Sequence, residues 1–411
     1  MPEFLELLPP AAALEKLLAH LPLPDLPSET IDTASALGRV LKNRVLAQEP
    51  LPAFTRSTVD GYALRAADTY GASESLPAYL PLVGEVPMGA APQFVLQPGT
   101  AASIHTGGML PPGADAVLML EYTQESRPGE LEVLRAVGAG ENILKVGEDV
   151  AIGQEVLPAG VRLRPAEIGG LMALGITEVE VVRRPRVGII SSGDEVVQPD
   201  EAVCPGQVRD INSYSLSALV TQAGAEPVRY GIVADQAAAL DAALRTALAE
   251  CDLVLVTAGS SASARDLTAD VVNRMGQPGV LVHGVNVKPG KPTILAVCDG
   301  KAVIGLPGNP VSALVIARIF LIPVIEQLSG LMVGHSRLFT QARLTVNLAS
   351  QAGREDYIPV KLISTPEGLA AAPIFYKSNL IFMLARADGL VRIPADATGL
   401  GAGMIVDVEN L

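Results

Sequence analysis

Two lysines that share a stiff loop are the residues in this chain best suited to chemistry. Lys288 and Lys291 stand in the stretch VNVKPGKPTIL (285–295), in a chain whose net charge is −14. Pro289 and Pro292 each restrict φ to about −65°, and Gly290 permits turn geometry that other residues avoid. The lysines are therefore expected on a rigid loop between strand-like runs. That arrangement suits an anion site, although the motif alone is also compatible with a solvated basic turn.

Acidic residues follow the strand-like run VGIISSG. Asp194 and Glu195 come directly after Ser191, Ser192 and Gly193. In one interpretation Glu195 accepts hydrogen bonds from the N–H groups of a heterocycle, or either acid holds a hydrated cation. In the alternative they are structural, because acids in the first turn of a helix are stabilised by its positive end.

Two more polar positions precede helix-like segments. Asp210 and Asn212 stand in VRDINSYS, where capping of the next helix is the alternative to facing a ligand. The loop TAGSSASARD contains Gly259, Ser260 and Ser261, which are small enough to let a ligand approach backbone N–H groups. The helix after this loop offers its positive end to a phosphate.

The same loop ends at Asp266, and Asp252 precedes the strand that leads into it. Mg²⁺ is typically held by one or two carboxylates together with phosphate oxygens. We therefore predict Asp266, with Asp252 as a second candidate, as metal ligands. The residues alone indicate an enzyme or binding protein for a phosphorylated ligand that uses Mg²⁺, with the lysine pair serving a second anion.

Two short segments with acidic residues lie far from these loops in sequence. Asp60 stands in FTRSTVDGYAL, and Glu148 and Asp149 stand in GENILKVGEDV. Without further information, Asp60 is most simply a turn residue, and Glu148 and Asp149 are most simply surface residues.

The segment 186–329 contains the elements that must position the loops. Near-continuous apolar runs alternate with amphipathic segments of 10–15 residues, which predicts a parallel sheet with helices on both faces. In such sheets ligands bind at the carboxyl ends of the strands. The polar loops SSGDE, TAGSSASARD and GLPGNP all follow predicted strands, so we expect them to form one site.

The remaining segments predict smaller units. Residues 10–50 carry helical apolar spacing, including ETIDTASALGRVLKNRVLA, and residues 55–149 carry short apolar runs separated by Gly/Pro turns, which predict a small β domain. RPAEIGGLMALG predicts a helix and TEVEVVRRP a strand. From about residue 336 the chain again predicts a compact β domain.

The composition excludes several classes of protein. The chain has 411 residues, a pI of about 4.8 and 49% hydrophobic residues, which suits a globular α/β protein of about three domains. The acidity argues against nucleic acid as a partner. Cys204, Cys251 and Cys298 form no disulfide framework or zinc motif. No signal peptide is evident, and the apolar run near residue 320 is interrupted by Arg318, so we expect no membrane span and a cytoplasmic location.

A series of motifs gives the chain a family resemblance. In chain order they are LPAFTRSTVDGYA, SIHTGGMLPPGADAVLMLE, GENILKVGEDV, SSGDEVV, the DxN of VRDIN, VKPGKPTI and GLPGNPVSAL. The series resembles the molybdopterin molybdenumtransferase family, which includes the E domains of gephyrin and its plant counterpart. The match extends over nearly the whole chain.

The resemblance implies an α/β plus β multidomain fold. A helical, discontinuous domain would span residues 1–50 and 150–184, and a β insertion domain would span 51–149. A central α/β molybdopterin-binding domain, similar to the adenylyltransferase of the same pathway, would span 185–329, and a C-terminal β-barrel-like domain would span 330–411. The family forms elongated homodimers whose active site lies between the α/β domain of one subunit and the β insertion domain of the other.

The resemblance also implies an activity. The family uses Mg²⁺ to cleave adenylated molybdopterin, and molybdate enters the dithiolene as AMP leaves, which gives molybdenum cofactor. Lys288, Lys291 and Pro292 would hold molybdate with help from Arg354 and Ser378 of the C-terminal domain. Asp266 would be the principal Mg²⁺ ligand, with Asp252 and Asp210 less certain, and Glu195 would recognise the pterin. From the partner subunit, Asp60, Thr106 and Asp149 would complete the cleft. The upstream adenylyltransferase and recipient molybdoenzymes are possible partners.

Three departures from the family pattern leave alternatives open. TAGSSASARD has one glycine where the family usually has two, and it adds Arg265. Val59 replaces a usual methionine, and GENILKVGED keeps only Lys145 where the family is often arginine-rich. The altered loop could indicate a changed nucleotide pocket, a tungstate-preferring insertase, or a paralogue that binds or carries molybdopterin without turnover.

Overall fold

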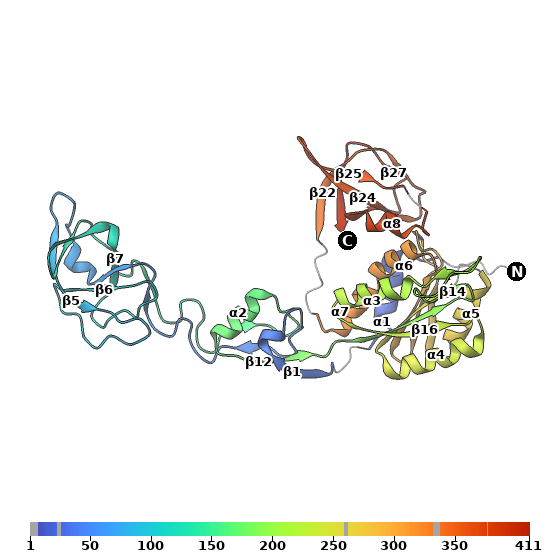
Figure 1. Cartoon of the computed structure of the whole chain (residues 1–411), viewed down its shortest axis with the longest axis horizontal. Coiled ribbons are helices and arrows are strands. Elements are labelled where there is room, and N and C mark those ends of the chain that lie inside the picture. The colour runs from blue at the N-terminus through green and yellow to red at the C-terminus, as the bar shows by residue number, and fades with distance from the viewer. Residues whose placement is uncertain (1–6, 23–25, 259–261, 332–337, 376) are drawn as a thin grey trace.

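The molecule is elongated and consists of four units that follow one another along its length (Figure 1). The computed structural model describes residues 7–22, 26–258, 262–331, 338–375 and 377–411, with the side chains of Ala258 and of 262–266 left out. The β insertion domain lies at one end, and a small linking unit follows it. The α/β domain and the C-terminal barrel lie together at the other end (Figure 1). The predicted α/β plus β multidomain fold is confirmed.

The α/β domain is built on a six-stranded sheet with the strand order β16-β13-β17-β21-β20-β18. Its strands are β13 (Arg186–Ser192), β16 (Glu226–Val233), β17 (Leu253–Ala258), β18 (Pro278–His283), β20 (Ile294–Cys298) and β21 (Lys301–Pro307). The four strands β16, β13, β17 and β21 are parallel, as predicted. The sheet as a whole is mixed, because β20 runs antiparallel to β21 and β18 antiparallel to β20.

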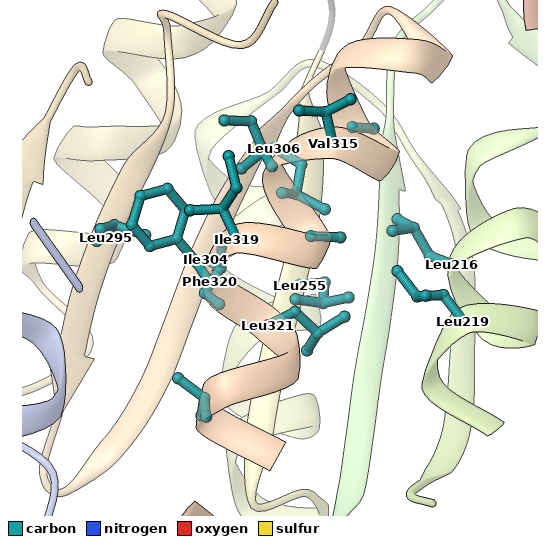
Figure 2. Close-up of a cluster of buried hydrophobic side chains, with 14 of the residues drawn as sticks. Leu216, Leu219, Leu255, Leu295, Ile304, Leu306, Val315, Ile319, Phe320 and Leu321 are labelled. Carbon is teal, nitrogen blue, oxygen red and sulfur yellow. The ribbon is translucent and has the colours of Figure 1, made fainter. Parts of the chain in front are cut away.

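Helices cover both faces of this sheet. On one face lie α1 (Pro10–Ala19), α3 (Asn212–Gln222), α6 (Pro310–Ile316), the π-helical turn η4 (Ala317–Leu321) and α7 (Ile322–Leu328), and on the other lie α4 (Ala237–Glu250) and α5 (Ala262–Asn273). Figure 2 shows Leu216 and Leu219 of α3 beside the apolar side chains of β17, β21 and η4. Leu255 and Phe320 are fully buried in this core, and each such side chain contributes about 2 kcal/mol of burial free energy.

The long apolar helical segment Pro310–Leu328 belongs to this core. It is long and apolar enough to cross a membrane by length and composition alone, but 61% of its most apolar window is buried inside the protein. Its π-helical turn directly precedes Pro323, which has no N–H to donate to the preceding turn.

The linking unit contradicts one prediction. The stretch 29–47 carries helical spacing, yet β1 (Ser28–Asp32) pairs antiparallel with β12 (Glu178–Val182), and only the short turn η1 (Thr33–Ser35) is helical before β2 (Val45–Leu46). Long-range pairing outweighs local periodicity here, because β1 completes a small core with α2 (Pro165–Ala173) and β11 (Glu155–Leu157). Helix α1 contributes Ala13 and Leu17 to the α/β core, not to this linking unit.

The β insertion domain contains a six-stranded sheet with the order β7-β4-β6-β5-β9-β8. Its strands are β4 (Gly61–Leu64), β5 (Ala78–Glu85), β6 (Ala101–Ile104), β7 (Ala116–Met119), β8 (Thr123–Arg127) and β9 (Glu130–Val133). A separate pair, β3 (Arg56–Ser57) with β10 (Ile143–Leu144), holds the beginning and end of the domain together.

The C-terminal domain is a closed barrel. Its strands are β22 (Phe339–Leu344), β24 (Glu355–Thr365), β25 (Gly368–Pro373), β26 (Gly389–Ile393) and β28 (Ile405–Asn410), and pairing of β24 with β26 closes the ring. The short strand β19 (Val287–Lys288) of the α/β domain adds to β24 in parallel. The lysine loop is therefore joined to the barrel by backbone pairing.

Candidate active site

A cleft of about 580 Å³ opens at the carboxyl ends of the central parallel strands. The chain passes from β13 outward to β16 and then returns to β17 on the other side of β13, so strand order reverses between β13 and β17. Ser191 and Ser192 from β13 and Thr257 from β17 line the cleft at this point. Open α/β sheets bind ligands at such reversal points, and the loops SSGDE and GLPGNP meet here through Glu195, Gly308 and Asn309.

Asp210 is a fully hydrogen-bonded residue at one wall of the cleft. Its carboxylate accepts from the hydroxyl groups of Ser191 (2.8 Å) and Ser213 (2.7 Å) and from the backbone N–H of Ser213 (3.1 Å). The residue is 5% exposed. Asp210 therefore accepts from a free N–H in the first turn of α3 and joins the end of β13 to that helix, whereas the capping alternative was made for Asn212 or Ser213.

Asn212 connects the same helix to the loop after β21. Its Nδ2 donates to the carbonyl of Gly308 at 2.8 Å, and Gly308, Asn309 and Pro310 line the cleft beside it. Its Oδ1 is buried and has no hydrogen-bond partner within the described part of the chain. The predicted residues Asp210 and Asn212 thus both lie at the cleft, in positions fixed by protein contacts.

Glu195 lies at the cleft as an exposed side chain. It begins a wall formed by the pair β14 (Val196–Val197) and β15 (Val208–Arg209), which are parallel. Gln207 and Arg209 also line this wall. An exposed carboxylate at the edge of this cleft is able to accept hydrogen bonds from the N–H groups of a planar heterocycle.

The lysine loop has the rigidity that its sequence predicts. The hydroxyl of Thr293 donates to the carbonyl of Gly290 at 2.7 Å, and the N–H of Val285 donates to the carbonyl of Lys291 at 2.9 Å. Gly290 has φ +114°, and a Cβ there would overlap the side chain of Ile316 at under 3.0 Å. Only glycine fits this position, because both its backbone angle and its surroundings exclude a side chain.

Both lysine side chains are exposed. Within the described part of the chain, the ion pairs include neither Lys288 nor Lys291. Two ammonium groups on one stiff loop attract a dianion, and the loop itself needs no reorganisation to receive it. Pro292 follows directly and is partly buried.

Arg354 reaches this region from the barrel. Strand β24 begins at Glu355, which pairs with Val287, and Asp356 pairs with Lys288. Arg354 therefore lies one residue from the point where the barrel joins the lysine loop. Its guanidinium donates to Asp356 through Nε at 2.7 Å and Nη2 at 3.1 Å.

Ser378 connects the barrel domain to the cleft. Its hydroxyl accepts from Nδ2 of Asn309 at 3.0 Å, and its carbonyl accepts from the N–H of Val311 at 3.1 Å. The neighbouring Asn379 lines the cleft. The barrel therefore contacts the α/β domain at the lysine loop and again at the beginning of α6.

The residues predicted from the β insertion domain form a separate cluster. The carboxylate of Asp60 accepts from the N–H (2.7 Å) and the hydroxyl (3.1 Å) of Thr106, and Nδ1 of His105 lies 3.6 Å away. The hydrogen bond from the Thr106 N–H is the main reason that the pKa of Asp60 is lowered. Asp149 is exposed in the loop after β10. The β insertion domain that carries these residues lies at the opposite end of the molecule from the α/β domain (Figure 1).

Asp252 requires a correction. It precedes β17, so it lies at the amino edge of the parallel strands, whereas the cleft lies at their carboxyl edge. Its carboxylate accepts from Nη2 of Arg183 at 2.9 Å and from the N–H of Arg186 at 2.7 Å. Asp252 is therefore a structural anchor for the start of β13, and we remove it from the candidate metal ligands.

Several predicted positions cannot be placed. Gly259, Ser260 and Ser261 lie outside the described residues, and so do the side chains of Arg265 and Asp266. Among the side chains that are described, no group of three or more His, Cys, Asp or Glu residues could hold a metal ion. Asp266, the predicted principal metal ligand, lies outside this set, so no step below is derived through the metal.

Sequence reasoning missed two features of the site. The β14–β15 wall carries no motif, and only the fold reveals that it encloses the cleft. Asp356 was also missed, although a carboxylate two residues after Arg354 on a strand occupies the same face and could have been paired with it.

Family models match most of the chain. The MoeA N-terminal region (domains I and II) matches residues 8–175, a probable molybdopterin binding domain matches 188–327, and the MoeA C-terminal region (domain IV) matches 341–411.

Individual proteins that are similar to this chain belong to the same family. A molybdopterin molybdenumtransferase of Nostoc sp. is 35% identical over 389 residues, which covers 93% of this chain and 89% of the relative. The Bacillus subtilis protein of the same name is 31% identical, with the same coverage. Among solved structures, a molybdopterin biosynthesis MoeA protein from Pyrococcus horikoshii OT3 superimposes with a TM-score of 0.86 at 32% identity, covering 99% of this chain and all of that one. The chain therefore belongs to the molybdopterin molybdenumtransferase (MoeA) family.

Proposed function

We propose that this protein is a molybdenum insertase, which transfers molybdate into adenylated molybdopterin with release of AMP and forms molybdenum cofactor. The observation that carries the proposal is the junction between the lysine loop and the barrel. There Lys288, Lys291 and Arg354 come from two domains, and strand pairing between β19 and β24 holds them together. Two exposed lysines on the loop, with the Arg354–Asp356 pair at the adjoining strand, favour a small dianion such as molybdate.

The cleft at the end of β13 is the proposed seat of the pterin and nucleotide. Glu195 would accept from the pterin N–H groups, and the small residues of the cleft floor would allow close approach. The contacts of Asn309 with Ser378 place the barrel beside this cleft, which supports a reaction between a ligand in the cleft and an anion on the lysines. The lysines would stabilise the charge that develops on oxygen atoms as the phosphate bond breaks.

The magnesium requirement remains a prediction from the family resemblance. Magnesium would neutralise the phosphate oxygens of the adenylate when bound. Asp266 is its proposed principal ligand, and its side chain lies outside the described set. The measurement is AMP release in Mg²⁺ and after removal of Mg²⁺ with a chelator.

We further propose that the enzyme acts as a homodimer in which each site is shared. The β insertion domain, which carries Asp60, Thr106 and Asp149, lies at the opposite end of the molecule from the α/β domain (Figure 1), so its residues would reach the cleft from a second subunit. A heterodimer of one Asp60→Ala chain and one Lys288→Ala/Lys291→Ala chain, purified through two tags, should recover about half of the wild-type activity, because one of its two sites is intact. Sites contained within one chain would recover none.

Location and other partners remain proposals. The mostly buried helix Pro310–Leu328 agrees with the expected cytoplasmic location. The upstream adenylyltransferase and the recipient molybdoenzymes are proposed partners because the family resemblance implies them.

The experiment that tests the proposed function measures AMP release from adenylated molybdopterin with no oxyanion, with molybdate and with tungstate. The Lys288→Ala/Lys291→Ala variant should lose oxyanion-dependent release. Lys361→Ala is the matched control, since it removes an exposed lysine of the barrel that pairs with Asp388, and it should behave as wild type. A carrier of molybdopterin, the alternative function, would bind the substrate and release no AMP under any of these conditions.

A further inference from the structure

Asp356 is a buried carboxylate at the edge of the proposed oxyanion site. The residue is 1% exposed and lies on β24 beside the lysine loop. A charged group removed from water is costly unless it is paired and hydrogen-bonded. A buried carboxylate in this position must be paired with a cationic group, and its place beside a binding site for anions calls for an explanation.

Its partner is Arg354. Two hydrogen bonds, from Nε to Oδ1 at 2.7 Å and from Nη2 to Oδ2 at 3.1 Å, form a planar fork between the two groups. This fork fixes the plane of the guanidinium and occupies one of its edges. Nη1 takes no part in the fork, and the Arg354 side chain keeps 28% of its surface exposed.

The fork lies where two domains join. Asp356 stands opposite Lys288 in the parallel pairing of β24 with β19, and the N–H of Glu355 donates to the carbonyl of Asn286 at 3.0 Å. The backbone on both sides of the fork is therefore fixed relative to the lysine loop. An arginine held by this carboxylate has a defined position relative to Lys288, whereas a loose arginine would sample many rotamers.

We propose that Asp356 is a positioning residue for the oxyanion site: it orients the guanidinium of Arg354 so that the edge outside the fork completes the binding of a tetrahedral dianion with Lys288 and Lys291. This inference rests on the proposed function, because it assigns the anion of that same site. Asp356 does not touch the anion. It acts by removing the rotamer freedom that Arg354 would otherwise lose on binding.

The expected loss of molybdate affinity can be estimated from the rotamer freedom of Arg354. Ordering a long side chain on binding costs enough to change affinity by about three- to tenfold. Removing Asp356 should therefore weaken molybdate binding and raise the KM for molybdate by about that factor. The kcat at saturating molybdate should remain unchanged, because Asp356 contacts no reacting atom.

The experiment compares Asp356→Asn, Arg354→Gln and the double variant. Binding of molybdate alone is measured by equilibrium dialysis with elemental analysis, and the KM is measured from AMP release. Arg354→Gln should weaken molybdate binding, and Asp356→Asn should cause no further weakening in the Arg354→Gln background, where the carboxylate has no guanidinium left to orient. Glu355→Gln is the matched control, because this neighbouring carboxylate contacts Tyr357 and Arg392 and takes no part in the fork, and it should bind molybdate as wild type does.

Arg354→Lys provides a second test if Asp356→Asn fails to fold. Lysine keeps the positive charge and loses the fork, so the proposal expects its molybdate binding to fall close to that of Arg354→Gln. Wild-type affinity in Arg354→Lys would overturn the proposal.

The outcomes separate this inference from the proposed function. If Arg354→Gln weakens molybdate binding and Asp356→Asn does not, the role of Asp356 is refuted and the insertase remains. Equal effects of Asp356→Asn with and without Arg354 would also refute it, since Asp356 would then act independently. If the wild type binds no molybdate, or if Arg354→Gln binds it normally, the proposed oxyanion site fails together with the inference.

Discussion

Replacement of Gly290 by alanine tests whether the lysine loop must be rigid. Gly290 has φ +114°, and a Cβ there would overlap Cγ1 and Cδ1 of Ile316, which is fully buried. The backbone angle costs an alanine about 1–2 kcal/mol. The overlap adds about 1–3 kcal/mol of overpacking, because the core around Ile316 is closed on all sides.

A matched variant separates these two contributions. Gly231→Ala lies in β16 of the same domain, at φ +83°, and its Cβ would meet nothing within 4 Å. It carries the backbone cost alone, so Gly290→Ala should be less stable by about a further 1–3 kcal/mol. Thermal and urea unfolding of the two variants measure this difference in the free energy of unfolding.

Molybdate binding should depend on the conformation of the lysine loop. Ile316 is fully buried, so Gly290→Ala should relieve the overlap in part by moving the backbone between Lys288 and Lys291, and the KM for molybdate should rise by about tenfold. Adding Ile316→Ala removes both overlapping atoms and should cost less in the Gly290→Ala background than in the wild type. Equal stability of Gly290→Ala and Gly231→Ala, with a normal KM for molybdate, would refute the reasoning.

Three further predictions concern other parts of the chain. Thr106→Val keeps the backbone N–H bond to Asp60 and removes the hydroxyl bond, so the pKa of Asp60 should rise in a carboxyl NMR titration and stay below its ordinary value. Hydrogen bonds from Arg164 lower the pKa of Glu167 from 4.5 to about 2, so Glu167 stabilises the fold above pH 4.5 and loses this contribution as the pH falls from 4.5 to 2. Glu167→Gln should therefore reduce the free energy of unfolding at pH 7 by about 1–2 kcal/mol, a value discounted because Arg164 is largely exposed, and by less at pH 3. Phe320→Ala should cost about 3–5 kcal/mol in denaturant unfolding, because the ring is fully buried.

The parallel half of the central sheet could be predicted because its strands are continuous apolar runs followed by polar loops. The directions of β18 and β20 could not be predicted, since the apolar run of a strand is the same whether it pairs parallel or antiparallel. The stretch 29–47 was misread as helical because its apolar spacing fits a helix, and its pairing partner, Glu178–Val182, lies far away in sequence.

The part of the site that could be predicted consists of residues that come directly after a parallel strand, because such residues lie at the carboxyl edge of the sheet. Glu195 follows β13, and Gly308 and Asn309 follow β21, so their meeting at the cleft could be expected from the parallel strands, whereas Asp210 and Asn212 reach it after the short strand β15. Asp252 precedes β17, and its order in the chain already places it at the opposite edge of a parallel sheet. The joining of the lysine loop to β24 was not predictable, because two-residue strand pairing between domains leaves no pattern in the sequence.

The most direct test of the central claim measures molybdenum in the pterin product and AMP in the same reaction. Adenylated molybdopterin, molybdate and Mg²⁺ are incubated with the wild-type protein, and the pterin is then separated and its metal content determined. An insertase should yield molybdenum-loaded pterin and AMP in equal amounts, with neither formed by Lys288→Ala/Lys291→Ala. Pterin that stays bound and free of molybdenum, with its adenylate intact, would contradict the account and leave a carrier of molybdopterin.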